Sequence, residues 1–526
     1  MADNNNLLEG LVYNYTSATE PPTRDVRIEP TNAYLGSCHS LKRAMGQGCA
    51  KFNSRYFSQG NGCQLNLALG IVRSFQNVVI IIHGPLGCGS NNIGLAGFYK
   101  TARALKGKPA NDVIWIHTNL DESDVINGGV VKLREAVLYA EREYRPDVVV
   151  VGNSCVPGII GDDIDSALEE LEPQVSAKLV PIHCEGFRSR FVASGYDAAY
   201  HGLLKKLADP PVRIESVLLG SSDEEERLEK IRRQNSRTVN LLNVGSTSRG
   251  DEVELSRILS SLGLTVNVLP LFGHIDEIAK MGEAGLNISI CATHDDYLIG
   301  HLKERFGTPY VIDTLPIGIK NTNQWLRAIG EAMNLKEETE KLIELETSQL
   351  LESLEPFKAT LAGKTLWVGG GETRIFTTAE FFQSLGMKVL GLKPHNFDRF
   401  AIPMLDDIED PETAVAVAAG QPAEELVYLK RLKPDLYVGH GGANGWVLKL
   451  GIPTIPLYGQ SQNYMGYSGA FELARKAARA LLNTNLSKKI SANVPLPFKQ
   501  VWYDSNPQDN IKEGQQEEPV ARSSVK

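Results

Sequence analysis

Short runs of β-branched and other apolar residues, each followed by a helical pattern, recur along most of the chain. Nearly continuous apolar strands joined by helices are typical of parallel sheets that are covered on both faces. The sequence therefore predicts an α/β protein built from doubly wound parallel sheets. The predicted strands occupy residues 78–82, 113–116, 148–151, 178–182, 239–242, 266–269, 288–290, 310–312, 366–368, 388–390, 436–438 and 454–456.

The 526 residues exceed what a single hydrophobic core organises, so about three domains are expected. Breaks are expected at the charged stretch 221–237 and at the long helical pattern 336–358. Each domain is expected to be a Rossmann-like unit that binds ligands where its strands end. The expected parts are an irregular N-terminal extension over residues 1–60, α/β domains over 61–230, 231–358 and 359–504, and a disordered tail over 505–526.

Composition excludes some classes of function. The net charge of −9 argues against a nucleic-acid-binding protein. No apolar run approaches the roughly 20 residues that cross a membrane, and the first residues lack the basic and apolar regions of an export signal. We therefore expect a cytoplasmic protein. Its seven cysteines, an odd number, suit free thiols or metal ligands better than a disulfide framework.

Three cysteines lie in glycine-rich turns or directly after a strand: Cys63, Cys88 and Cys155. Glycine allows the backbone to approach a bulky inorganic cluster and leaves amide groups free to bond its sulfides. Each cysteine taken alone could equally be a small buried core residue. The three together favour an iron–sulfur cluster.

The chain resembles the alpha-type subunits of nitrogenase component 1 from Cys63 to about Arg475. The resemblance implies three Rossmann-like domains around a buried metallocluster. It is carried by Ile82-His83-Gly84-Pro85-Leu86-Gly87-Cys88, by residues 155–164, by Cys184-Glu185-Gly186-Phe187, by residues 287–291 with 306–309, and by Tyr464-Met465-Gly466-Tyr467 ahead of residues 473–475.

The resemblance also implies the cofactors and partners. Cys63, Cys88 and Cys155 would hold the alpha side of a P-cluster-type iron–sulfur cluster that a beta-type subunit completes in an α2β2 heterotetramer. Cys291 would hold a large iron–sulfur cofactor, FeMo-cofactor-like or all-iron, although a core cysteine at a strand end is the alternative. An ATP-dependent iron protein would supply electrons. We expect Cys184 to be structural. Cys38 and Cys49 are expected to be surface thiols, and the alternative is that they are extra cluster ligands.

Several positions depart from nitrogenase itself. The motif match puts Met465 where nitrogenase has the histidine that binds the second end of its cofactor, and a thioether is a soft, weak ligand. Val192 and Tyr196 match the family's cofactor-pocket glutamine and histidine. Gly370, in the run 369–371, is expected to let the backbone approach the cofactor. The candidate proton donors are Tyr196, His201 and His440, although a histidine that bonds to the backbone of its glycine-rich loop is the favoured alternative for His440.

These departures predict that dinitrogen is not the substrate. The favoured hypothesis is an oxidoreductase subunit of the methylthio-alkane reductase type, acting on a small molecule. The alternative is a scaffold for nitrogenase cofactor assembly, which binds a cluster and releases it without catalysing a reaction. Tetrapyrrole reductases of the same superfamily usually lack the cofactor cysteine, so Cys291 argues against that branch.

Overall fold

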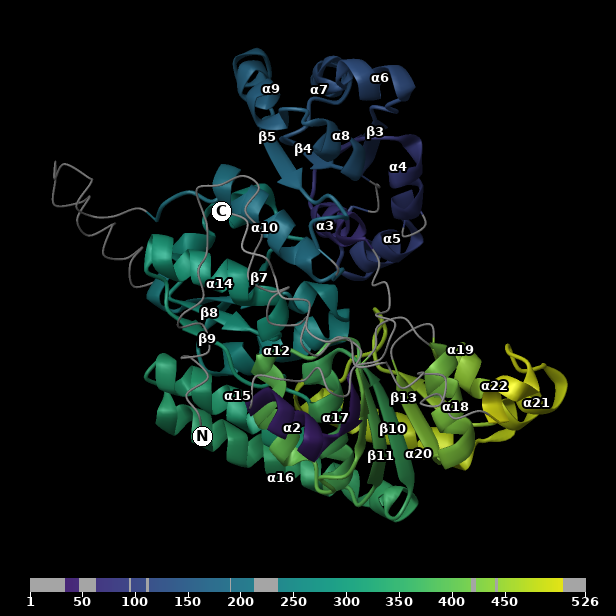
Figure 1. The fold of residues 1–526 in the computed structure, drawn as a ribbon. Coiled ribbons are helices and arrows are strands. Elements are labelled where there is room, and N and C mark those ends of the chain that lie inside the picture. Colours follow the sequence, from purple (N-terminus) through teal and green to yellow (C-terminus); the bar gives the residue numbers. More distant parts are fainter. Residues whose placement is uncertain are drawn as a thin grey trace, which may run out of the picture.

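The computed structural model describes residues 34–46, 63–93, 96–109, 113–189, 191–211, 235–417, 422–439 and 443–504. They form three α/β units, each organised around its own sheet (Figure 1). Nearly all strand pairs are parallel, which confirms the predicted fold class. The expected break at 221–237 lies almost entirely outside the described residues, and so does the expected tail at 505–526.

The first unit has a four-stranded parallel sheet in the order β3-β2-β4-β5. Alternate residues of its central strands enter two separate cores: Ile80 and Val150 pack on one face, and Ile81 and Val151 on the other. Helices α3 and α10 cover the first face, and α7 and α9 cover the second. The elements are α3 (Gln64–Val72), β2 (Val78–His83), α4 (Leu86–Ile93), α5 (Ala96–Leu105), β3 (Ile114–His117), α6 (Glu122–Asn127), α7 (Val130–Tyr144), β4 (Val148–Asn153), α8 (Cys155–Ile160), α9 (Ile164–Leu171), β5 (Lys178–His183) and α10 (Ser194–Lys206).

The second unit has a four-stranded parallel sheet in the order β7-β6-β8-β9. The 26-residue helix α16 follows it, close to the helix expected at 336–358, and packs on α15 and α20. The elements are β6 (Thr238–Leu242), α12 (Arg249–Ser261), β7 (Thr265–Leu269), α13 (Ile275–Ala279), β8 (Leu286–Ser289), α14 (Ala292–Phe306), β9 (Tyr310–Val311), α15 (Gly318–Ala332) and α16 (Lys336–Leu361).

The third unit has a six-stranded sheet in the order β1-β12-β11-β10-β13-β14. Its outer strand β1 (Leu35–Ser37) comes from the N-terminal segment and pairs antiparallel with β12. The segment was expected to be irregular, because three residues carry no strand pattern by themselves and their partner is distant in sequence. The other elements are α2 (Cys38–Gly46), β10 (Thr365–Gly370), α17 (Glu372–Ser384), β11 (Lys388–Pro394), β12 (Ala414–Ala416), α18 (Pro422–Leu432), β13 (Leu436–Gly439), α19 (Ala443–Leu448), β14 (Thr454–Pro456), α20 (Gly466–Leu482), α21 (Asn485–Asn493) and α22 (Gln500–Asp504).

Several strands from different units end in residues that carry thiol, imidazole or hydroxyl groups. Cys155 follows β4, Cys291 closely follows β8, His395 follows β11, and Tyr458 lies shortly after β14. Ligands of parallel α/β sheets bind at such carboxyl ends. Within the described part of the chain, no helix has the length and apolar character needed to cross a membrane.

Candidate functional site

The three cysteines of the first unit each begin a helix. Cys63 is the N-cap of α3, Cys88 lies in the first turn of α4, and Cys155 is the first residue of α8. Three helix starts therefore present sulfur from one end of this unit.

Gly186 shows how close two of these thiols lie. A Cβ atom built on Gly186 would meet the Sγ of Cys63 at 2.8 Å and the Sγ of Cys155 at 3.5 Å. Burial raises the pKa of Cys63, and the negative charges of Cys155 and Cys88 raise it further. The thiols are thus close enough to affect one another. In the described residues, however, no three His, Cys, Asp or Glu side chains converge as they would around a single metal ion.

Glu185 holds the loop that carries Gly186. Its side chain accepts hydrogen bonds from Asn153 Nδ2 at 2.8 Å and from Arg188 Nε at 2.7 Å. Its backbone carbonyl accepts one from Gln64 Nε2 at 2.6 Å. These bonds tie the loop to β4 and α3, the elements beside Cys155 and Cys63. Cys184 is fully buried, in agreement with the structural role expected for it.

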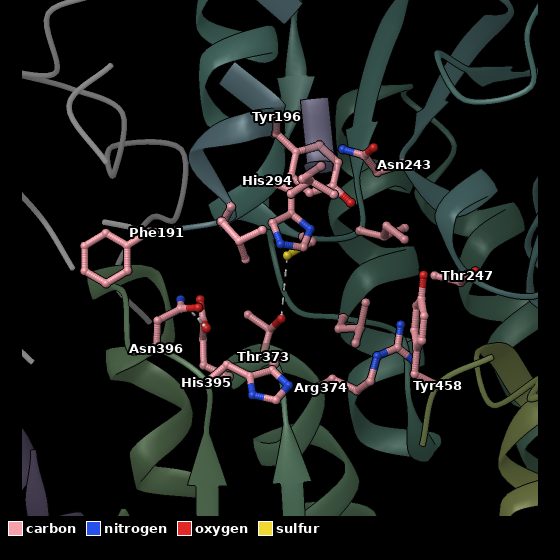
Figure 2. Close-up of a pocket in the computed structure, with 18 residues that line it drawn as sticks. Phe191, Tyr196, Asn243, Thr247, His294, Thr373, Arg374, His395, Asn396 and Tyr458 are labelled. Carbon is pink, nitrogen blue, oxygen red and sulfur yellow. Dashed lines mark hydrogen bonds between the residues drawn. The ribbon is translucent and has the colours of Figure 1, made fainter. Parts of the chain in front are cut away.

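A second site is a cavity of about 450 Å³ where the three units meet (Figure 2). Its lining residues come from all three units, and the cavity is therefore formed by tertiary packing. They are Leu67, Phe191, Val192, Ala193 and Tyr196 from the first unit; Asn243, Thr247, Ile290, Cys291, His294 and Leu315 from the second; and Gly371, Glu372, Thr373, Arg374, His395, Asn396 and Tyr458 from the third.

Cys291 lines this cavity as the N-cap of α14. Its Sγ lies 4.0 Å from Thr373 Oγ1, the contact drawn dashed in Figure 2. Burial, followed by the nearby carboxylates of Glu372 and Asp295, raises its pKa to about 12. The free thiol would therefore stay protonated at neutral pH, and a bound metal would be needed to hold it as a thiolate.

A buried polar network supports the turn that carries Cys291. The Cys291 backbone N–H donates to Ser289 Oγ at 3.0 Å, and Ser289 Oγ donates to Asp295 at 2.7 Å. Asn243 donates to the same carboxyl group and accepts from Tyr200 at 2.6 Å. Burial raises the pKa of Asp295 to about 7. The network joins α10, the residue after β6, and α14, and it holds the backbone at Cys291 in place.

Two rings stack in the cavity wall. The imidazole of His294 lies parallel to the phenol ring of Tyr196, with centroids 4.3 Å apart and planes 19° apart. Val192, four residues before Tyr196, also faces the cavity. The first unit thus contributes the apolar side chain of Val192 and the Tyr196 ring that stacks on His294.

The third unit contributes polar groups and open backbone. Glu372 accepts hydrogen bonds from Thr293 at 2.6 Å and from Asn396 at 2.8 Å, so its two oxygens are both engaged. A Cβ atom built on Gly371 would meet nothing within 4 Å. Because Gly371 lines the cavity, its backbone faces space that a ligand can occupy.

Met465 does not have the position that the motif match suggested. It is fully buried in the core as the N-cap of α20, its backbone N–H donates to Asp251, and it does not line the cavity. Tyr458, on the same connection after β14, lines the cavity instead. Gly459 and Gly466, which both have positive φ, turn the chain between β14 and α20, so Tyr458 and Met465 face different surroundings.

His201 is also directed away from the cavity. Five residues after Tyr196 on α10, it points about 140° around the helix from that residue. There it hydrogen-bonds Tyr297 of α14, and it is not a lining residue. A direct proton-donating role for His201 therefore does not fit the structure.

The remaining predicted residues have mixed outcomes. Gly370 ends β10, and its carbonyl accepts the His395 N–H at 2.9 Å, so it positions His395 while Gly371 faces the cavity. Cys38 is buried in α2, which corrects the expected surface thiol. His440 and Cys49 lie outside the described residues.

The model of one protein family, the nitrogenase component 1 type oxidoreductases, matches residues 63–482. The chain belongs to this family. It is 26% identical over 479 residues to the nitrogenase molybdenum-iron protein alpha chain of Methanosarcina barkeri, covering 80% of this chain and 85% of that one. It is likewise 26% identical over 453 residues to the nitrogenase iron-molybdenum cofactor biosynthesis protein NifE of Rippkaea orientalis, covering 84% and 90%.

This component 1 chain also shares its fold with a solved nitrogenase structure, Nitrogenase Cp1 at pH 6.5. The TM-score is 0.65 at 21% identity, over 85% of this chain and 93% of that one. The sequence matches indicate an alpha-type subunit, and they extend equally to an alpha chain and to a cofactor biosynthesis protein.

Sequence reasoning missed most of the cavity residues of this component 1 chain, among them His294, Arg374 and Tyr458. Each had a local signal, because each follows a strand by a few residues on a connection that carries a helix or a glycine. Strand ends could therefore have suggested them as candidates. Which of the many strand-end residues share one cavity depends on how the three units pack.

Proposed function

We propose that this chain is the catalytic alpha-type subunit of a nitrogenase-like metallocluster reductase that cleaves carbon–sulfur bonds of small methylthio-alkanes. The observation that carries the proposal is the cavity between the three units, which combines one half-buried thiol, Cys291, with a largely apolar wall. Apolar side chains suit a thioether, and the thiol suits a metal. Leu67, Phe191, Val192, Ile290 and Leu315 make up that wall.

The residues of the two sites fit metalloclusters. Gly186 leaves space between Cys63 and Cys155 that a Cβ would fill, and Gly371 leaves open space in the cavity. Cys63, Cys88 and Cys155 would hold the alpha side of a P-cluster-type cluster, and Cys291 would hold a large iron–sulfur cofactor. When bound, these clusters supply electron transfer and the reducing centre.

Exposed apolar side chains beside the interface cysteines support a partner subunit. Leu86, two residues before Cys88, is 64% exposed, and Ile159, on the helix that Cys155 begins, is 72% exposed. Phe187, next to Gly186, is 54% exposed. Large apolar side chains concentrated at one site indicate a protein interface. We assign it to a homologous beta-type subunit in an α2β2 assembly, which receives electrons from an ATP-dependent iron protein.

The reaction consumes two electrons and two protons. A methylthio-alkane R–S–CH₃ gives R–H and CH₃SH: the R–S bond breaks, the alkyl carbon gains hydrogen, and the leaving thiolate gains a proton. The chain's own residues bind the thioether against the apolar wall and exclude water from it. The Tyr196 hydroxyl, in the ring pair with His294, is the proposed proton donor.

The test supplies the purified complex with an iron protein, ATP and a reductant. It measures methanethiol from 2-(methylthio)ethanol or dimethyl sulfide and, side by side, ammonia from dinitrogen. We expect methanethiol, little ammonia, and loss of methanethiol in the Cys291→Ala complex. Ammonia without methanethiol would refute the substrate assignment.

The likeness to NifE, as extensive as that to the alpha chain, favours a second candidate. In that case the chain is an assembly scaffold that holds a cluster on Cys291 and releases it. The same preparation decides between the two: neither product, together with transfer of its iron to an apo acceptor protein, would establish the scaffold.

A further inference from the structure

Arg374 is a half-buried cation that lines the cavity from the first turn of α17. Among the described residues its guanidinium has neither an ion-pair partner nor a side-chain hydrogen bond. The acidic side chain closest to it in sequence, Glu372, is already hydrogen-bonded by Thr293 and Asn396. A half-buried guanidinium that no described acidic side chain neutralises is available to bind an anion in the cavity.

The position of Arg374 indicates the shape of that ligand. Figure 2 shows Arg374 beside Tyr458 on one side of the cavity, with Phe191 on the opposite side. Phe191 and Val192 belong to the apolar wall, whereas Tyr458, beside Arg374 in Figure 2, carries a hydroxyl group. A molecule that fits this arrangement has an apolar end and an anionic end. Arginine binds carboxylates with two parallel hydrogen bonds, which makes a carboxylate the best-matched anion.

We propose that Arg374 binds the carboxylate of the substrate, and that the substrate is a short ω-methylthio carboxylate. This inference rests on the proposed carbon–sulfur cleavage and narrows its substrate class. For 3-(methylthio)propanoate the step is CH₃SCH₂CH₂CO₂⁻ + 2 e⁻ + 2 H⁺ → CH₃CH₂CO₂⁻ + CH₃SH. The bond from sulfur to the propanoate carbon breaks, and the iron protein supplies both electrons.

The experiment compares 3-(methylthio)propanoate with its neutral counterpart 3-(methylthio)propan-1-ol, using the complete complex. The quantity measured is the ratio of kcat/KM for the acid to kcat/KM for the alcohol. Arg374→Gln should lower this ratio by at least about tenfold, because a charged hydrogen-bonding partner is lost. Arg374→Lys should give an intermediate ratio, since lysine keeps the positive charge but cannot donate two parallel hydrogen bonds to one carboxylate. Arg142→Gln, on an exposed surface arginine, should keep the wild-type ratio.

A second readout does not require turnover. Equilibrium dialysis measures the Kd of labelled 3-(methylthio)propanoate for the complex without iron protein, and Arg374→Gln should raise it at least about tenfold. An unchanged ratio with an unchanged Kd would overturn the inference. Loss of cofactor iron in Arg374→Gln would overturn it too, because Arg374 would then neutralise the cofactor.

The two proposals fail in different ways. If the wild-type complex cleaves the alcohol but neither prefers nor binds the acid through Arg374, the carboxylate inference fails and carbon–sulfur cleavage stands. If it cleaves neither compound, carbon–sulfur cleavage fails. The dialysis measurement then still decides whether Arg374 binds a carboxylate.

Discussion

Replacing Gly186 with alanine places a methyl group between two proposed cluster ligands. The new Cβ would lie 2.8 Å from Cys63 Sγ and 3.5 Å from Cys155 Sγ. Non-bonded carbon atoms pack at about 3.5–4.0 Å, so the first contact is too short by roughly 1 Å. Either Cys63 turns away or the loop held by Glu185 moves. Overpacking of this kind typically costs about 1–3 kcal/mol.

If that free energy acts on cluster binding, the affinity for the interface cluster falls roughly 5- to 150-fold. The measurements are iron per heterodimer and the electron paramagnetic resonance signal of the interface cluster in the purified complex. Gly371→Ala offers a contrast, because its Cβ would enter the cavity and should reduce the cofactor signal while sparing the interface cluster.

Gly445→Ala is the matched control, since a Cβ there meets nothing within 4 Å, and Gly445 lies on α19 of the third unit and does not line the cavity. It should resemble the wild type in both signals. A full interface-cluster signal in Gly186→Ala would show that the cluster does not lie between Cys63 and Cys155, and the reasoning would be refuted.

Three further outcomes are expected. Cys88→Ala should lower iron per heterodimer and weaken subunit association; unchanged iron and unchanged electron delivery would contradict its role as a ligand. Cys291→Ala should abolish the cofactor signal and leave the interface cluster intact, and if neither signal changes, Cys291 is a core residue. Burial alone would lower the pKa of His183, but hydrogen bonds to Asp165 and Glu185 outweigh it and raise the pKa to about 9. This ion pair should therefore stabilise the fold fully below about pH 6.5, by up to about 3 kcal/mol, and lose that effect as the pH rises through about 9. His183→Asn should accordingly lower Tm more at pH 6 than at pH 10, and an equal loss at both would show that His183 is neutral.

Local patterns in the sequence determined the elements of this fold. Strands such as β2 and β4 are apolar throughout because both faces of a doubly wound sheet are buried, and this composition is visible without coordinates. Positions after strands or beside glycines marked Cys63, Cys88 and Cys155 as candidate cluster ligands, because such ligands need backbone that can approach closely, whereas Cys291 was marked by the resemblance to the nitrogenase family. Val192 and Tyr196 came from a motif close to Cys184, and both line the cavity.

Only the tertiary structure decided which side chains share a site. Met465 and Tyr458 lie on one connection, yet the packing of α20 buries the first in the core while the second lines the cavity. Tyr196 and His201 lie on one helix and face different neighbours, and β1 finds its partner β12 far along the chain. The place of Arg374 in the cavity wall, where no described acidic side chain pairs with it, follows only from the packing of the three units. The physical reason is that periodicity reports which face of an element is buried, whereas the direction of a loop residue and the identity of its neighbours depend on contacts between distant segments.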